Sequence, residues 1–147
     1  MLKIILLLLM TISLATSNKK EDIINILEGY NNAFSNENYS KIISFFDYPT
    51  SFNLNDKTIM ASNKFKLRLI YWKIRGGLPE YYSYSKWDEI KVKLIDDNIA
   101  IVNAKFSRYK NDDTIFYSGE AQYYLRYNKN EWKIFSLTPY EQIKDLN

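Results

Sequence analysis

The chain has 147 residues, of which 46% are hydrophobic and 16% aromatic, and it contains neither histidine nor cysteine. This length corresponds to one domain, and the aromatic content argues against disorder. The missing residue types exclude catalytic triads, thiol nucleophiles, zinc sites built from imidazole or thiolate, and disulfides. The formal charge of +3 is small, and the basic residues are mixed with acidic ones, so the composition predicts a solvated surface and no nucleic-acid partner.

The N-terminus has the pattern of a secretory signal peptide. Lys3 precedes an apolar stretch that ends near Leu14, and small residues follow up to Ser17. The alternative is a membrane anchor, but the stretch is shorter than the roughly 20 apolar residues that a span needs. We therefore predict that residues 1–17 are removed by cleavage after Ser17. The mature protein, residues 18–147, is expected to be one exported domain, periplasmic or secreted, without a membrane span.

Two helices are expected next, after a polar lead-in over residues 18–21. Residues 22–34 carry apolar side chains at gaps of one and three, which is the stripe of an amphipathic helix. Its members are Ile23, Ile26, Leu27, Tyr30, Ala33 and Phe34. A second, short helix is predicted over residues 39–46, and Pro49 prevents it from continuing.

Two short strands and a third helix follow. Residues 50–54 alternate as a strand does, and residues 57–61 form a plausible partner after a turn. Ser62 or Asn63 is expected to cap a helix that runs to about Arg75, where a Gly-Gly pair ends it. The apolar face predicted for this helix contains Phe65, Leu69 and Trp72, widened by Leu67, Ile70 and Ile74.

Four long strands, over residues 83–95, 99–109, 114–127 and 131–138, close the chain. Short polar turns join them, which predicts an antiparallel meander with one buried and one open face. The face expected to meet the helices contains Ile90, Val92, Ala100, Val102, Tyr117, Tyr123 and Ile134. The open face is expected to contain Ile99, Ile101, Phe116, Tyr124, Phe135 and Leu137.

This order of elements resembles the NTF2-like (SnoaL/DUF4440-type) superfamily. The segments that carry the resemblance are the first helix Ile23–Phe34, the run Phe45-Phe46-Asp47 leading into Thr50-Ser51-Phe52, and the closing Glu131-Trp132-Lys133-Ile134. The resemblance implies an α+β fold in which a strongly curved, mostly antiparallel sheet wraps the N-terminal helices as a cone. Such cones often hold a pocket and often dimerise. The superfamily includes isomerases, dehydratases, polyketide cyclases and non-enzymes, so the fold leaves the function open.

Four aromatic residues are candidates for contacts with a small apolar or aromatic ligand inside the cone: Tyr30, Trp72, Tyr84 and Tyr123. A tyrosine hydroxyl can donate a hydrogen bond to a ligand oxygen, and an indole can stack on a ring. The alternative is that these are core residues whose polar groups are satisfied within the protein.

Asp47 is the candidate base of an acid–base enzyme of the isomerase or dehydratase type, with Tyr30 as its partner. The resemblance implies a carboxylate near this point whose pKa is raised by burial. The alternative is a turn residue that hydrogen-bonds the backbone before Pro49. Isomerases of this fold also use a second acid on a later strand, and none is expected to face inward here, since Glu120 is predicted to face outward. A binding protein without catalysis is therefore favoured.

The remaining patterns predict neither a metal nor a cofactor. The acidic residues of two turns, Asp96, Asp97, Asp112 and Asp113, do not match the spacing of an EF-hand, and turn chemistry explains them. The sequon at Asn38 matters only in a eukaryotic secretory pathway. The apolar open face of the sheet predicts a homodimer, or a module that binds another protein. The alternative is that residues 140–146 fold over part of this face.

Overall fold

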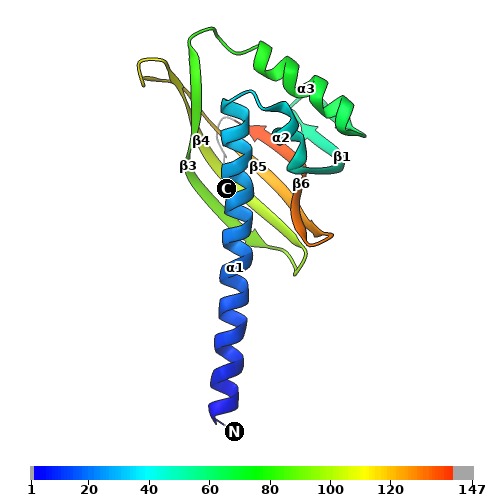
Figure 1. Cartoon of the computed structure of the whole chain (residues 1–147), viewed down its shortest axis with the longest axis vertical. Helices are drawn as coiled ribbons and strands as arrows, with labels where there is room; N and C mark the ends of the chain where they lie inside the picture. The colour runs from blue at the N-terminus through cyan, green and yellow to red at the C-terminus, as the bar shows by residue number, and fades with distance from the viewer. Residues whose placement is uncertain (1, 141–147) are drawn as a thin grey trace, which may run out of the picture.

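The computed structural model describes residues 2–140, with side chains from Asn18 onward. Its elements in chain order are α1 (Leu2–Ser35), α2 (Tyr39–Ser44), β1 (Phe46–Asn53), β2 (Thr58–Ala61), α3 (Lys64–Gly76), β3 (Tyr82–Leu94), β4 (Ile99–Lys110), β5 (Ile115–Asn128) and β6 (Glu131–Tyr140). This order confirms the predicted α+β class. Figure 1 shows α1, α2 and α3 on one side of a single curved sheet, the arrangement expected of the cone.

The sheet has six strands in the order β2-β1-β6-β5-β4-β3. The predicted antiparallel meander is confirmed for β3 to β6. Beyond β6, the sheet continues with β1, which pairs with β6 in parallel, and with β2, which pairs with β1 antiparallel. The parallel pair joins segments far apart in the chain, so local patterning gives no sign of it.

Irregularities in strand pairing change which residues face the helices. The register between β5 and β6 shifts so that Leu125 pairs with Ile134 whereas Tyr123 pairs with Leu137. Such a register shift inserts one extra residue into a strand, which bends the strand and reverses the alternation of its side chains. Leu137 is therefore buried, and its predicted place on the open face is wrong. Phe116 also departs from the prediction, because it packs against the core beside Tyr82.

Helix α1 supplies one wall of the core. Its side chains Ile23 and Leu27 are completely buried. Two hydrogen bonds tie the helix to β3: the Trp87 Nε1–H donates to the Leu27 carbonyl at 3.0 Å, and the Asn31 side chain donates to the Ser85 carbonyl at 2.8 Å. The helix is continuous from its start, so residues 18–21 are helical and not the predicted lead-in. Its N-terminal half projects beyond the sheet (Figure 1).

The boundary between α2 and β1 lies earlier than predicted. Asn38 caps α2, since its Oδ1 accepts a hydrogen bond from the Lys41 amide at 3.0 Å. The helix ends at Ser44, and the strand already begins at Phe46. The reason is pairing with β6: the Ile134 amide donates to the Phe45 carbonyl at 2.9 Å, which draws this segment into the sheet.

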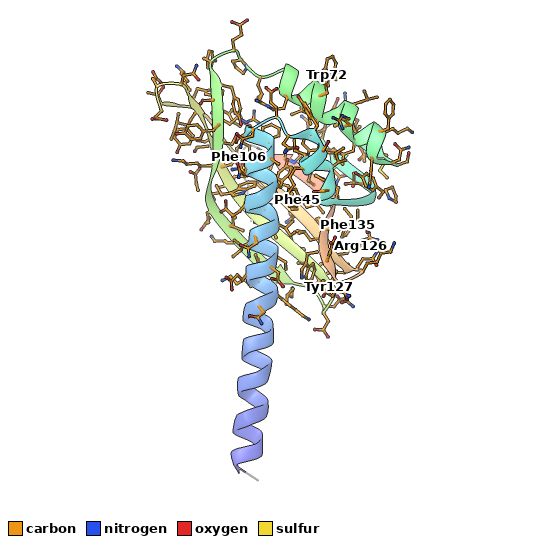
Figure 2. All side chains as sticks on the ribbon, viewed as in Figure 1. Phe45, Trp72, Phe106, Arg126, Tyr127 and Phe135 are labelled. Carbon is orange, nitrogen blue, oxygen red and sulfur yellow. The ribbon has the colours of Figure 1, made fainter. Side chains whose placement is uncertain are left out.

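The packing face of α3 is the largest departure from the predicted packing. Asn63 caps the helix as predicted, with its Oδ1 accepting from the Lys66 amide at 3.0 Å. The buried side chains are Leu67 and Tyr71, whereas Trp72 is 67% exposed and points away from the sheet (Figure 2). Phe65 and Leu69 share its exposed side. Both sets have helical spacing, so periodicity could not choose between them.

Candidate functional site

A pocket of about 270 Å³ lies between the concave face of the sheet and the helices. Its lining comes from α1, α3 and five strands: Tyr30, Asn31, Phe34, Phe52, Leu54, Tyr71, Ile74, Ser85, Trp87, Phe106, Arg108, Ala121, Tyr123, Leu137 and Pro139. This volume is at the lower end of the range for small-molecule sites. The pocket therefore suits a small molecule with one or two rings, or a short chain.

The burial of the lining residues defines the bottom and the mouth of the pocket. Tyr71 and Tyr123 are almost completely buried. Ile74 and Pro139 are exposed, and both lie near the ends of their elements. The pocket therefore opens between the C-terminal end of α3 and the end of β6.

Three tyrosine side chains form a cluster at the bottom. The Tyr71 hydroxyl donates to the Tyr30 hydroxyl at 2.9 Å, and the Tyr30 ring meets the Tyr123 ring edge-on at 6.0 Å. Burial raises the pKa of all three hydroxyls above the ordinary value, and the positive charge of Arg108 offsets part of this pKa rise at Tyr30 and Tyr123. The three groups therefore stay neutral near pH 7 and act as hydrogen-bond donors and acceptors.

Arg108 is the charged residue of the pocket, and the sequence reasoning missed it. Its guanidinium carbon lies 5.1 Å from the ring centre of Tyr117, 5.4 Å from that of Phe106 and 6.0 Å from that of Phe34. Its Nε is buried without a hydrogen-bond partner among the described residues. Arg108 follows Phe106 at a spacing of two, so the alternation of the strand already predicts an inward position.

Of the four predicted ligand contacts, the structure brings Tyr30 and Tyr123 together in the pocket. Trp72 and Tyr84 lie outside it. Tyr84 stacks on Tyr109 at 4.8 Å on the open face, and its hydroxyl donates to Asp113 at 2.8 Å. The cause is a register shift between Trp87 and Glu89, which reverses the alternation along β3.

Asp47 does not lie in the pocket. Its Oδ2 is 3.5 Å from the Nε of Arg126, and its Oδ1 accepts from the Tyr48 amide at 2.9 Å. The Arg126 guanidinium in turn lies 4.1 Å from the ring centre of Phe135, on the face of the sheet opposite the one to which its buried neighbour Leu125 belongs. Asp47 and Tyr30 are therefore on opposite sides of the sheet. No acidic residue belongs to the described lining of the pocket.

The described residues contain neither a metal-binding cluster nor a helix that could span a membrane. Residues 2–140 contain no group of three or more acidic, histidine or cysteine side chains that could hold a metal ion. Within the same part of the chain, no helix is both long and apolar enough to cross a membrane.

Known protein families and structures give the same fold. A family model described as an NTF2-like protein (DUF6841) matches residues 20–142. A Nostoc punctiforme protein of unknown function with a cystatin-like fold superposes with a TM-score of 0.70 at 11% identity, over 82% of this chain and 88% of that one. No protein of curated function matches the sequence.

Two further structures are described as NTF2-like. A Shewanella oneidensis protein of unknown function has a TM-score of 0.66 at 16% identity, over 82% of this chain and 98% of its own. A Streptomyces avermitilis protein, named as a candidate dehydratase, has a TM-score of 0.68 at 11% identity, over 88% and 99%. Such low identities establish the fold alone. Because the family model covers most of the sequence, the chain belongs to the NTF2-like family DUF6841.

Proposed function

We propose that the protein binds a small apolar or aromatic ligand in the pocket of the cone. The observation that carries this proposal is the open pocket of about 270 Å³ between the concave face of the sheet and the helices. Aromatic walls with a few convergent polar groups are typical of small-molecule sites.

The walls of the pocket are held in place before any ligand enters. The Trp87 indole is anchored by its hydrogen bond to the Leu27 carbonyl, and its ring meets those of Phe106 and Tyr123 edge-on at 6.1 and 5.9 Å. A preformed wall reduces the conformational entropy lost on binding. The geometry therefore favours binding of a rigid, ring-sized molecule.

Titration with a neutral, polarity-sensitive naphthalene dye tests this proposal. We expect saturable binding of one dye per chain, with the blue-shifted emission that an apolar site produces. Emission that rises linearly with dye concentration, or does not change, would contradict the proposal.

We also propose a homodimer that forms through the open face of the sheet. Ile101 pairs with Tyr124 across β4 and β5, and the Tyr124 ring lies 6.2 Å from that of Phe135. Residues 141–147, the other candidate cover, lie outside the described residues. In light scattering after gel filtration, we expect twice the mass of one chain, and one chain for Ile101→Asp. Leu69→Asp on α3 is the control and should stay dimeric; a monomeric wild type would contradict the proposal.

We further propose export, with cleavage after Ser17. Contacts that hold α1 against the rest of the protein are present beyond that point. Lys19 forms an ion pair with Asp97 at 3.1 Å, and Ile23 is completely buried. Removal of residues 1–17 would therefore leave these contacts intact. The intact mass of protein recovered outside the cytoplasm should correspond to a chain that begins at Asn18, and a full-length mass there would contradict this.

A further inference from the structure

Three arginines of this protein have a buried Nε without a hydrogen bond among the described residues: Arg75, Arg108 and Arg126. Two of them have an acidic partner. Arg75 lies 2.7 Å from a Glu37 oxygen, and Arg126 lies 3.5 Å from an Asp47 oxygen. Arg108 takes part in none of the ion pairs of the described residues. It is also the one of the three that lines the pocket.

Arg108 as a whole is half-buried, but its Nε is a buried atom. A buried charged group is rarely left without a partner, because removing its charge from water is costly. Here the rings of Tyr117, Phe106 and Phe34 lie within 6.0 Å and stabilise the cation in part. Aromatic faces leave the N–H groups of a guanidinium without acceptors. An acceptor inside the pocket would give the buried Nε of Arg108 the partner that it lacks among the described residues, and a negatively charged acceptor would also match its charge.

The hydroxyl groups of the tyrosine cluster line the same pocket as Arg108. The Tyr30 hydroxyl accepts the hydrogen bond of Tyr71, and it also interacts with the Tyr123 hydroxyl. The positive charge of Arg108 also lowers the pKa of Tyr30 and Tyr123 against the effect of burial, so the guanidinium acts on both hydroxyls. The pocket thus contains one cation, the Arg108 guanidinium, together with neutral tyrosine hydroxyls.

We propose that the ligand carries a carboxylate, which the Arg108 guanidinium binds while its apolar part lies against Trp87 and Phe106. This inference rests on the proposed function of the pocket. The planar guanidinium matches a carboxylate with two parallel hydrogen bonds. One cation neutralises one carboxylate, whereas a phosphate dianion would leave buried negative charge without a partner. The ligand class is therefore a small aromatic or short-chain acid.

Calorimetric titration of the wild type with benzoate, phenylacetate and 3-phenylpropionate, each paired with its neutral amide, tests the inference. We expect the best acid to bind at least tenfold tighter than its amide, which corresponds to about 1.4 kcal/mol. Arg108→Met should abolish this preference while the amide still binds. Arg126→Met is the matched control, since Arg126 also stacks on a ring, Phe135, but on the open face; it should keep the full preference.

The possible outcomes separate the preference for a carboxylate from the ligand-binding function of the pocket. Equal binding of acid and amide by the wild type overturns the carboxylate and leaves the pocket intact. Binding of neither compound overturns both the carboxylate and the ligand-binding function. A preference that survives in Arg108→Met overturns the role of Arg108. Should that variant not fold, Arg108→Lys keeps the charge but loses the planar fork, and it should show a reduced preference; an unchanged preference would overturn the two-hydrogen-bond contact.

Discussion

Replacement of Tyr71 by alanine is expected to lower the free energy of unfolding by about 3–5 kcal/mol, the usual loss for a large aromatic side chain removed from a core. Tyr71 is 2% exposed. Its ring packs against those of Tyr30, Phe34, Phe46 and Phe52 at 5.7–6.2 Å, and its hydroxyl donates to Tyr30. The substitution would leave a cavity beside the pocket and remove the hydroxyl that donates a hydrogen bond to Tyr30. Urea denaturation followed by circular dichroism measures the loss.

Trp72→Ala is the control for this prediction, because it removes an even larger side chain from the next position. Trp72 is 67% exposed, so its loss should change the free energy of unfolding by no more than about 0.5 kcal/mol. A larger loss for Trp72→Ala than for Tyr71→Ala would mean that α3 packs through the face that the sequence predicts and not through Leu67 and Tyr71.

The second large effect is expected at Ala121, where a longer side chain would fill the pocket. Ala121 is 2% exposed, lies on β5 and lines the pocket. In Ala121→Met, the added atoms would occupy the space of the ligand. We expect dye binding to weaken about a hundredfold, equivalent to roughly 2.7 kcal/mol. The stability should rise by about 0.5–2 kcal/mol, as is common when a cavity is filled.

The matched control is Ala100→Met. Ala100 faces inward on β4 and is completely buried, but it does not line the pocket. Overpacking there should cost about 1–3 kcal/mol of stability while dye binding persists. If Ala121→Met instead loses stability and keeps binding, the space beside Ala121 is not the ligand site.

The sequence predicted the fold where local patterns are regular. The alternation of Ala100, Val102 and Ala104 placed these residues correctly in the core. The pattern failed at irregular pairings, because a shift of one residue moves every later side chain to the other face. The misplacement of Tyr84 and Leu137 has this cause. No local signal in either strand marks the shift.

The sequence predicted only some of the residues that line the pocket. Tyr30 and Tyr123 were found because a helical stripe and a regular strand placed them inward. Arg108 was not predicted, although the same alternation gives its inward position. Asp47 was misplaced because its position depends on the parallel pairing of β1 with β6 and on Arg126, neither of which local sequence encodes.

The most direct test of binding inside the cone uses the three tryptophans of the chain. Trp87 lines the pocket, Trp72 lies on the exposed side of α3, and Trp132 is buried beside Tyr127, away from the pocket. Each gives one indole N–H signal in a ¹H–¹⁵N spectrum, which single phenylalanine substitutions assign.

Titration with phenylacetate should shift the Trp87 signal with saturation and leave those of Trp72 and Trp132 in place. A saturable shift of Trp72 or Trp132 with Trp87 unchanged, or no shift of any of the three, would contradict ligand binding inside the cone.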